Sequence, residues 1–298
     1  MATKKKALAD MDVPEKLAMM INAKPEEDER VCELVNSENV AMVGFIASYV
    51  GVKVSPVEQH FASIGLIEEF GVEAIAEMLK KSSAKKLYLL VNSPGGGMSS
   101  SYKIAKVLRN CFDEIVTFVP HIAASGGTLL AVMGNEIVMG EMSQISPMDV
   151  QIPYKGTRVS AATFMRFYYR ATSWFETVAP EEAPYPQRAL ADKLDPFIME
   201  EWDGFMDASI DYVTEILTLA GYDNSEKLAR RLVLAYPTHG YVITPDKAKD
   251  LGFNVKDPSE YQDVWDIMSY WLSLYMFEQE STHCIRYAIP SGGKNDGQ

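Results

Sequence analysis

Two stretches decide the fold of this chain: LYLLVNSPGGG at residues 87–97 and IVTFVPHIAASGGTLL at residues 115–130. Each is a short apolar run, which predicts a buried strand, followed by a turn rich in small residues and a helical pattern. Strand, turn and helix repeated in series predict an α/β fold with a parallel sheet and helices on its faces. Since the carboxyl ends of parallel strands meet at one edge, we expect the two turns to lie side by side there.

The pattern continues on both sides of these stretches. Residues 40–50 (VAMVGFIASYV) predict a further buried strand, and residues 72–81 predict a helix. Residues 154–194 are less regular and predict a helical insertion. A long helix follows Asp195-Pro196, and residues 261–277 predict a strongly apolar, aromatic helix. We expect the insertion and the aromatic helix to provide subunit contacts.

Composition excludes several classes of protein. The 298 residues are 47% hydrophobic, which is ample for a sizeable core, and the net charge of −13 argues against a nucleic-acid partner. The three cysteines show neither CxxC nor metal-ligand spacing, so no disulfide framework and no metal site are predicted. No apolar run is long enough to span a membrane and no signal peptide is visible, so we expect a cytoplasmic protein without a membrane anchor.

The second turn carries a serine, Ser125, where a helix begins. Free backbone N–H groups at such a position favour negative charge, so a serine alkoxide or a tetrahedral oxyanion would be stabilised there. The alternative is that Ser125 only caps the helix. The sequence is not GxSxG, which disfavours an α/β-hydrolase nucleophile elbow, and neither GxxxxGK[ST] nor GxGxxG is present to indicate a nucleotide site.

With NSPGG, a helix, a strand, ASGGT and NEIVMGEMSQISPMD in this order, the chain resembles the Clp/crotonase fold. It is most similar to serine peptidases of the ClpP class, and among these to the serine dehydrogenase proteinase (SDH) family, cytosolic relatives of signal peptide peptidase A. The resemblance covers about residues 40–255, including YPTHGYVITPDKAKDLGFNV. It implies a ClpP/crotonase-like peptidase domain over residues 36–258. The composition outside this domain predicts a partly flexible N-terminal arm over 1–35, and a C-terminal helix with a disordered tail over 259–298.

The resemblance implies roles for individual residues. Ser125 matches the peptidase nucleophile, and Gly96 and Gly126 match the backbone donors of the oxyanion hole. The Clp proteolytic subunit places a histidine at about Val150, beside Asp149, so a Ser-His-Asp triad in that order is absent.

Two residues remain as the base that activates the serine. Lys193 lies before a helix, where signal peptide peptidase A has its lysine, and it would need burial to lower its pKa. His239 lies in the region that supplies the acid in ClpP-like chains, and Asp149 would orient it. His121 lies four residues before Ser125 and is predicted to be structural, because side chains near a strand end point away from the turn that follows.

The sequence therefore predicts a serine peptidase that cleaves peptides or unfolded polypeptides and needs no cofactor or metal. The resemblance implies a homo-oligomeric ring, and nothing in the sequence identifies an ATPase partner. The alternatives are a catalytically inactive ring subunit or adaptor and, with less support, a crotonase-type acyl-CoA enzyme, for which no placed glutamate pair is found near the turns.

Overall fold

The computed structural model describes residues 29–47, 66–154, 156–179, 181–193, 195–276 and 283–290. They divide into two compact units. The sheet unit comprises the described residues of Met1–Ser146, Ile216–Asp223 and Val242–Gln298, and the helical unit those of Pro147–Glu215 and Asn224–Tyr241. The described part of the domain predicted over 36–258 is thus shared between both units.

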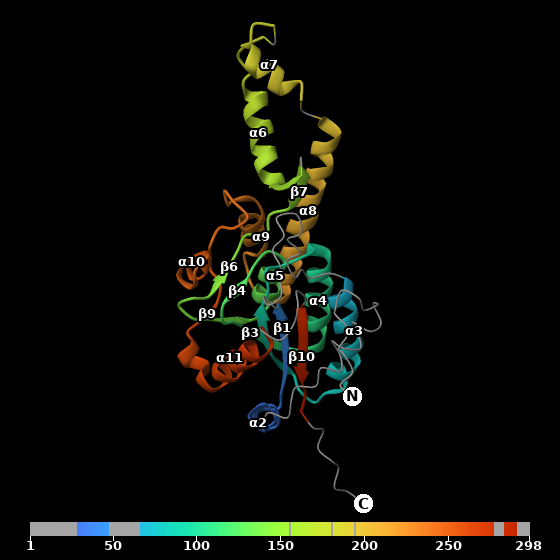
Figure 1. The fold of residues 1–298 in the computed structure, drawn as a ribbon, viewed down its shortest axis with the longest axis vertical. Helices are drawn as coiled ribbons and strands as arrows, with labels where there is room; N and C mark the ends of the chain where they lie inside the picture. The colour runs from blue at the N-terminus through green and yellow to red at the C-terminus, as the bar shows by residue number, and fades with distance from the viewer. Residues whose placement is uncertain are drawn as a thin grey trace, which may run out of the picture. The chain divides into compact units, whose positions relative to one another are not determined.

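The sheet unit is built on a six-stranded sheet in the order β10-β1-β2-β3-β5-β9 (Figure 1). Strands β1, β2, β3, β5 and β9 run parallel to one another. Strand β10 runs antiparallel to its neighbour β1. The predicted α/β fold with a parallel sheet is confirmed. Its strands are β1 (Val40–Ala47), β2 (Lys86–Asn92), β3 (Glu114–Val119), β5 (Glu136–Met139), β9 (Val255–Lys256) and β10 (His283–Ala288).

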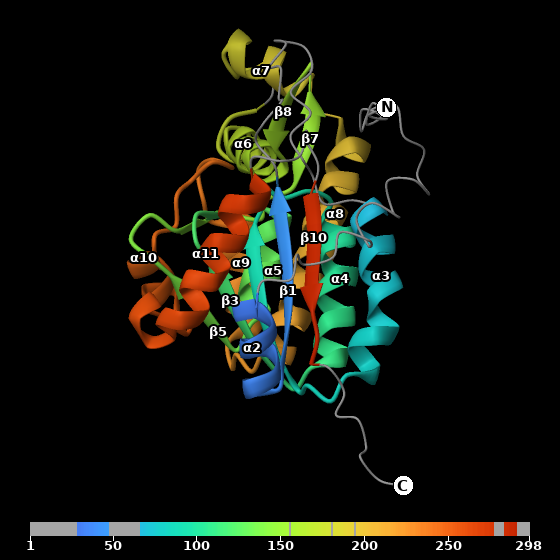
Figure 2. The same cartoon turned by 60° about the horizontal axis from the view of Figure 1, so that its bottom comes forward.

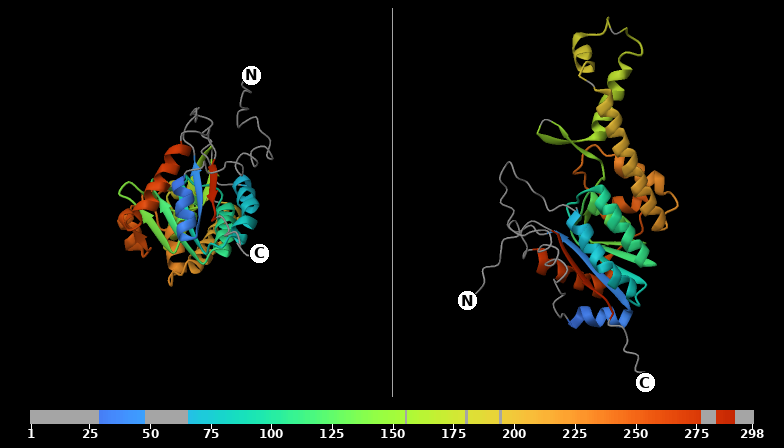
Figure 3. Two further views of the ribbon diagram at one scale, coloured as in Figure 1. Left: turned by 90° about the horizontal axis from the view of Figure 1, so that it is seen from below. Right: turned by 90° about the vertical axis from the view of Figure 1, so that its right-hand side faces the viewer.

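Helices cover both faces of this sheet. In the described residues of the sheet unit, the helices are α2 (Glu29–Glu38), α3 (Leu66–Lys81), α4 (Met98–Cys111), α5 (Gly126–Val132), α10 (Pro245–Leu251), the 3-10 helix η2 (Pro258–Tyr261) and α11 (Gln262–Met276). Figure 2 shows α2 and α11 on one side of β1 and β10, and α3 and α4 on the other. The view from below in Figure 3 shows the same layers.

The aromatic helix α11 packs on the sheet. Its buried residues, among them Met268 and Trp271, form one core cluster with alternate residues of the strands, such as Met42 and Phe118, and with α2. Alternation follows from the two-residue period of a strand. The apolar face for which we expected a subunit contact is therefore covered by the sheet, and among the side chains of α11 up to residue 273 the most exposed large apolar one is Tyr270. No helix within the described ranges has the length and apolar character that a membrane crossing requires.

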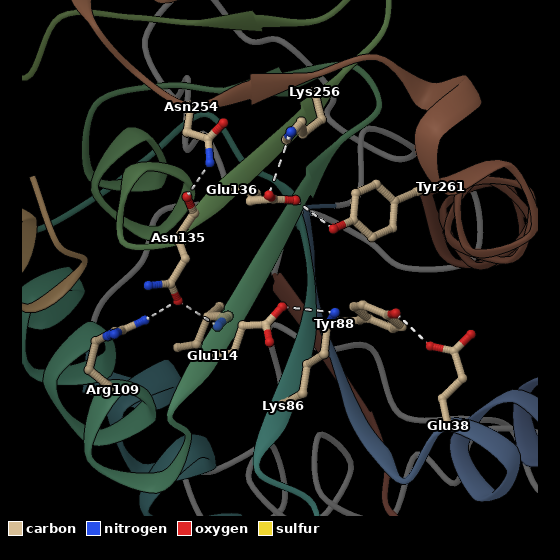
Figure 4. Close-up of polar contacts among 11 residues, drawn as sticks. Glu38, Lys86, Tyr88, Arg109, Glu114, Asn135, Glu136, Asn254, Lys256 and Tyr261 are labelled. Atoms are coloured by element: carbon tan, nitrogen blue, oxygen red, sulfur yellow. Dashed lines mark hydrogen bonds and ion pairs between the residues drawn. The ribbon is translucent and has the colours of Figure 1, made fainter.

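Polar contacts tie together the starts of the parallel strands, away from the ends that carry the turns (Figure 4). The Tyr88 hydroxyl donates to Glu38 at 2.6 Å, and the Tyr261 hydroxyl donates to Glu136. Burial, and then the hydrogen bond to a carboxylate, raise the pKa of both phenols above the ordinary range. Asn135, just before β5, accepts from the N–H of Ile115 at 2.8 Å, which fixes the start of β3 against β5.

The chain turns sharply where β3 ends. Pro120 lacks the N–H that would continue the ladder, so β3 stops at Val119 and the chain resumes as β4 (Ile122–Ala123). β4 pairs in parallel with β6 (Gln144–Ile145). Directly after β2, the backbone N–H of Ser93 donates to the carbonyl of Ile122 at 2.8 Å, and the backbone carbonyl of Ser93 accepts from the N–H of Ala124 at 2.9 Å. The chain segments that follow β2 and β3 thus lie side by side, as the parallel arrangement predicts.

The helical unit contains the insertion. Its elements are the antiparallel pair β7 (Gln151–Tyr154) and β8 (Thr157–Ser160), with α6 (Ala161–Ser173), α7 (Tyr185–Ala191) and α9 (Ser225–Leu234). Helix α8 (Pro196–Leu219) begins in this unit, and its residues from Ile216 belong to the sheet unit. A small core of Ile152, Ala161, Ala162, Met165, Met199 and Met206 holds α6 and α8 to the hairpin.

Candidate active site

Ser125 occupies a strained position between β4 and α5. It is the N-cap residue of α5, with φ 50° and ψ −119°, and its side chain makes no capping hydrogen bond. Among the described non-glycine residues only Asn39 shares a positive φ, and asparagine tolerates that region better than serine does. Such a conformation costs about 1–3 kcal/mol and persists only where the surroundings enforce it. The capping alternative for the Ser125 side chain therefore has no support in the geometry.

The glycines of the first turn lie directly against this serine. Gly95 has φ 105°, and a Cβ added to it would lie 2.7 Å from the Cβ of Ser125 and would also collide with the carbonyl oxygen of Ala124. The Gly95 N–H donates to the Ser93 hydroxyl at 3.0 Å, which fixes the start of the turn. Only a residue without a side chain can fill this position.

Gly96 and Gly126, the predicted oxyanion donors, are neighbours in the sheet unit. A Cβ on Gly126 would lie 3.3 Å from the nitrogen and 3.2 Å from the oxygen of Gly96, and it would collide with the Ser101 hydroxyl. The N–H of Gly126 has no hydrogen-bond acceptor within the described ranges. The two glycine backbones are thus packed together next to Ser125.

Asp149 and His239 form a pair within the helical unit. Nδ1 of His239 lies 2.7 Å from Oδ1 of Asp149, and the aspartate side chain is 5% exposed while that of the histidine is 37% exposed. A carboxylate acceptor at this distance assigns the proton to Nδ1, which leaves Nε2 unprotonated in the neutral ring. The pair therefore has the geometry of a histidine base oriented by an aspartate.

Gln151 completes the surroundings of Asp149. Its side-chain amide donates to Oδ2 of Asp149 at 2.7 Å, so each carboxylate oxygen has one partner. Gln151 was not among the predicted site residues. A signal was available, because side chains two residues apart in an extended segment project to the same side.

Lys193, the other candidate base, and His121, which was predicted to be structural, are placed differently. Lys193 is exposed in the turn after α7, so the burial that a lysine base needs is absent there. His121 is exposed, and its carbonyl accepts from the N–H of Gln144, a backbone role in the β4–β6 pairing. No group of three His, Cys, Asp or Glu side chains in the described part of the chain is placed to hold a metal ion.

One part of the chain is similar to a known protein family. Residues 60–174 match the model of the ClpP-like SDH-type serine proteinases. The predicted resemblance is thereby confirmed. The matched segment includes Gly96, Ser125 and Asp149 and ends before Lys193 and His239. The turn that contains Ser125 therefore lies in the part of the chain that is similar to a serine proteinase family.

Two curated relatives come from Methanocaldococcus jannaschii and are themselves uncharacterized. Protein MJ1495 is 29% identical over 171 residues, covering 56% of this chain and 51% of its own length. Protein MJ0137 is 28% identical over 186 residues, covering 62% of this chain and 58% of its own length. The chain thus spans little more than half the length of the curated relatives that it matches.

Among solved structures, the chain is similar to two mutants of the 1510-N membrane-bound stomatin-specific protease. One covers 65% of this chain and 74% of its own, at 14% identity and a TM-score of 0.42. The other, in complex with a substrate peptide, covers 68% of this chain and 74% of its own, at 15% identity and a TM-score of 0.44.

Proposed function

We propose that this chain is a serine peptidase that cleaves peptides or unfolded polypeptides, with Ser125 as its nucleophile. The observation that carries the proposal is the strained backbone of Ser125, φ 50°, at a strand-to-helix turn where its side chain caps nothing. Strain of this kind gathers at functional sites, and a sharp turn between strand and helix is how hydrolases expose a nucleophilic serine. The match to a serine proteinase family over the same turn supports it.

The backbone N–H groups of Gly126 and Gly96 are proposed as the oxyanion hole. Attack by the Ser125 hydroxyl on a peptide carbonyl places negative charge on the carbonyl oxygen. Two preorganised N–H donors stabilise that charge more in the transition state than in the substrate. The close packing of the two glycines next to Ser125 supports this assignment.

His239 is proposed as the general base, oriented by Asp149. Its Nε2 would take the proton of the Ser125 hydroxyl and later give it to the leaving amine, while Asp149 stabilises the imidazolium through Nδ1. The 2.7 Å contact supports this choice over Lys193, which is exposed. The chemistry requires no metal ion or organic cofactor.

Covalent labelling tests the nucleophile. A fluorophosphonate probe should form an adduct that peptide mapping places on Ser125, and Ser125→Ala should remove it, because the probe reports an activated serine. Ser99→Ala is the matched control, since Ser99 is an exposed serine on the nearby helix α4. A folded wild-type protein without an adduct would contradict the proposal and favour the inactive subunit or adaptor.

The expected homo-oligomer is proposed to form through the helical unit. This unit exposes aromatic side chains, among them Phe197 (86%), Tyr185 (74%) and Phe205 (51%), and exposed apolar groups of this size mark interaction surfaces. Sedimentation equilibrium should give a multiple of the 33.2 kDa chain, reduced in Phe197→Ser but not in Met142→Ser, which changes an exposed residue of the sheet unit. A monomeric wild type would overturn this.

The cytoplasmic location stays a prediction from the sequence.

A further inference from the structure

Ser146 contacts the backbone of the proposed nucleophile. It directly follows β6, is 4% exposed, and its hydroxyl oxygen accepts the N–H of Ser125 at 2.9 Å. Both residues belong to the sheet unit. The hydrogen bond therefore fixes the amide of the strained residue itself.

The backbone of Ser146 is itself held by hydrogen bonds at its N–H and at its carbonyl oxygen. Its N–H donates to the hydroxyl of Thr128 at 3.1 Å, and that hydroxyl, on helix α5, lies 2.9 Å from the carbonyl oxygen of Ser146 and 2.8 Å from that of Ala123. The parallel pairing of Ala123 with Ile145 brings these residues together. Ser146 is thus a rigid acceptor, because α5 and the β4–β6 pair fix its backbone.

We propose that Ser146 is a positioning residue for the reaction of Ser125. By accepting the Ser125 N–H, it holds the serine at positive φ and so directs the side chain away from a capping position. The same hydrogen bond occupies the N–H of Ser125, so this N–H is not available to the oxyanion, for which Gly126 and Gly96 remain the proposed donors. The inference rests on the proposed peptidase function.

A positioning role differs from a purely structural one in the kinetic constant that it changes. Loss of the acceptor frees Ser125 to relax toward an ordinary φ, which displaces the attacking oxygen, and displacements of about 1 Å cost about 100-fold in rate. Substrate binding does not depend on the position of that oxygen. We therefore expect kcat to fall and KM to stay nearly constant.

The test compares three variants in peptide hydrolysis and in fluorophosphonate labelling. Ser146→Ala should lower kcat and the labelling rate about 10- to 100-fold, and Ser146→Thr, which keeps the hydroxyl, should restore most of both. Ser143→Ala is the matched control, because Ser143 is also buried and accepts the N–H of Gly140 at 2.8 Å without contacting Ser125. It should change thermal stability and leave kcat unchanged.

Amide hydrogen exchange at Ser125 provides a readout independent of activity. The Ser125 N–H should exchange about tenfold faster in Ser146→Ala than in wild type or Ser143→Ala. Unchanged exchange, an unchanged kcat in Ser146→Ala, or an equal loss of kcat in Ser143→Ala would each overturn the positioning role. Absence of a Ser125 adduct in the wild-type protein would instead overturn the proposed function, and with it any catalytic meaning of the hydrogen bond.

Discussion

Replacing His239 with alanine should lower kcat for peptide hydrolysis about 1000-fold. A general base contributes about 10²- to 10⁴-fold, and removal of the imidazole leaves the Ser125 hydroxyl without a proton acceptor. The fluorophosphonate labelling rate should fall with kcat, because the probe reacts by the same attack. Stopped assays with a fluorogenic peptide and time-resolved labelling measure both quantities.

Lys193→Ala is the control for the histidine, since it removes the other candidate base. Lys193 is exposed and should be replaceable with less than about a threefold change in kcat, as surface substitutions usually are near neutral. The reverse pattern, with activity lost in Lys193→Ala and kept in His239→Ala, would assign the reaction to a serine–lysine pair. Equal loss in both would show that the assay reports folding of the helical unit.

Gly95→Ala should reduce kcat at least about 100-fold and destabilise the protein. The new Cβ would lie 2.7 Å from the Cβ of Ser125, so either the nucleophile or the glycine turn must move. The positive φ adds about 1–3 kcal/mol of strain to the cost. Urea unfolding gives the stability, and kcat at saturating peptide gives the effect on the site.

A second glycine separates collision from strain. Gly252 ends α10 with φ 103°, close to the 105° of Gly95, and a Cβ there would meet nothing within 4 Å. Gly252→Ala should therefore lower stability by a similar conformational cost and leave kcat unchanged. If both variants lose activity alike, the loss comes from stability, and the close approach of Gly95 to Ser125 has no catalytic role.

The core of the sheet unit was predictable from sequence because its strands are short apolar runs followed by glycine turns. The adjacency of those turns follows from parallel pairing alone. β10 was missed because residues 283–288 (HCIRYA) carry no apolar alternation and were assigned to a C-terminal tail. The boundary of the two units at Ser146 was also missed, because no linker composition marks it and the division depends on tertiary contacts.

The residues of the proposed site differ in how far the sequence alone points to them. Ser125, Gly96 and Gly126 lie in local motifs, so the residue types and their spacing indicate the chemistry. Asp149 and His239 are 90 residues apart in the chain, and only the fold of the helical unit shows that they touch. Ser146 was missed for the same reason, since its contact with Ser125 depends on how β6 pairs with β4.

The 2.7 Å contact between Asp149 and His239 bears on how inactive relatives are recognised. The resemblance to the Clp proteolytic subunit implies that Asp149 lies near the position of the histidine there, and that His239 lies in the region that supplies the acid. A survey that identifies inactive enzymes by comparing aligned residues would find both catalytic residues substituted and would classify the chain as inactive. A criterion based on the distance between any imidazole and any carboxylate would keep it, because the hydrogen bond is the same whichever residue comes first.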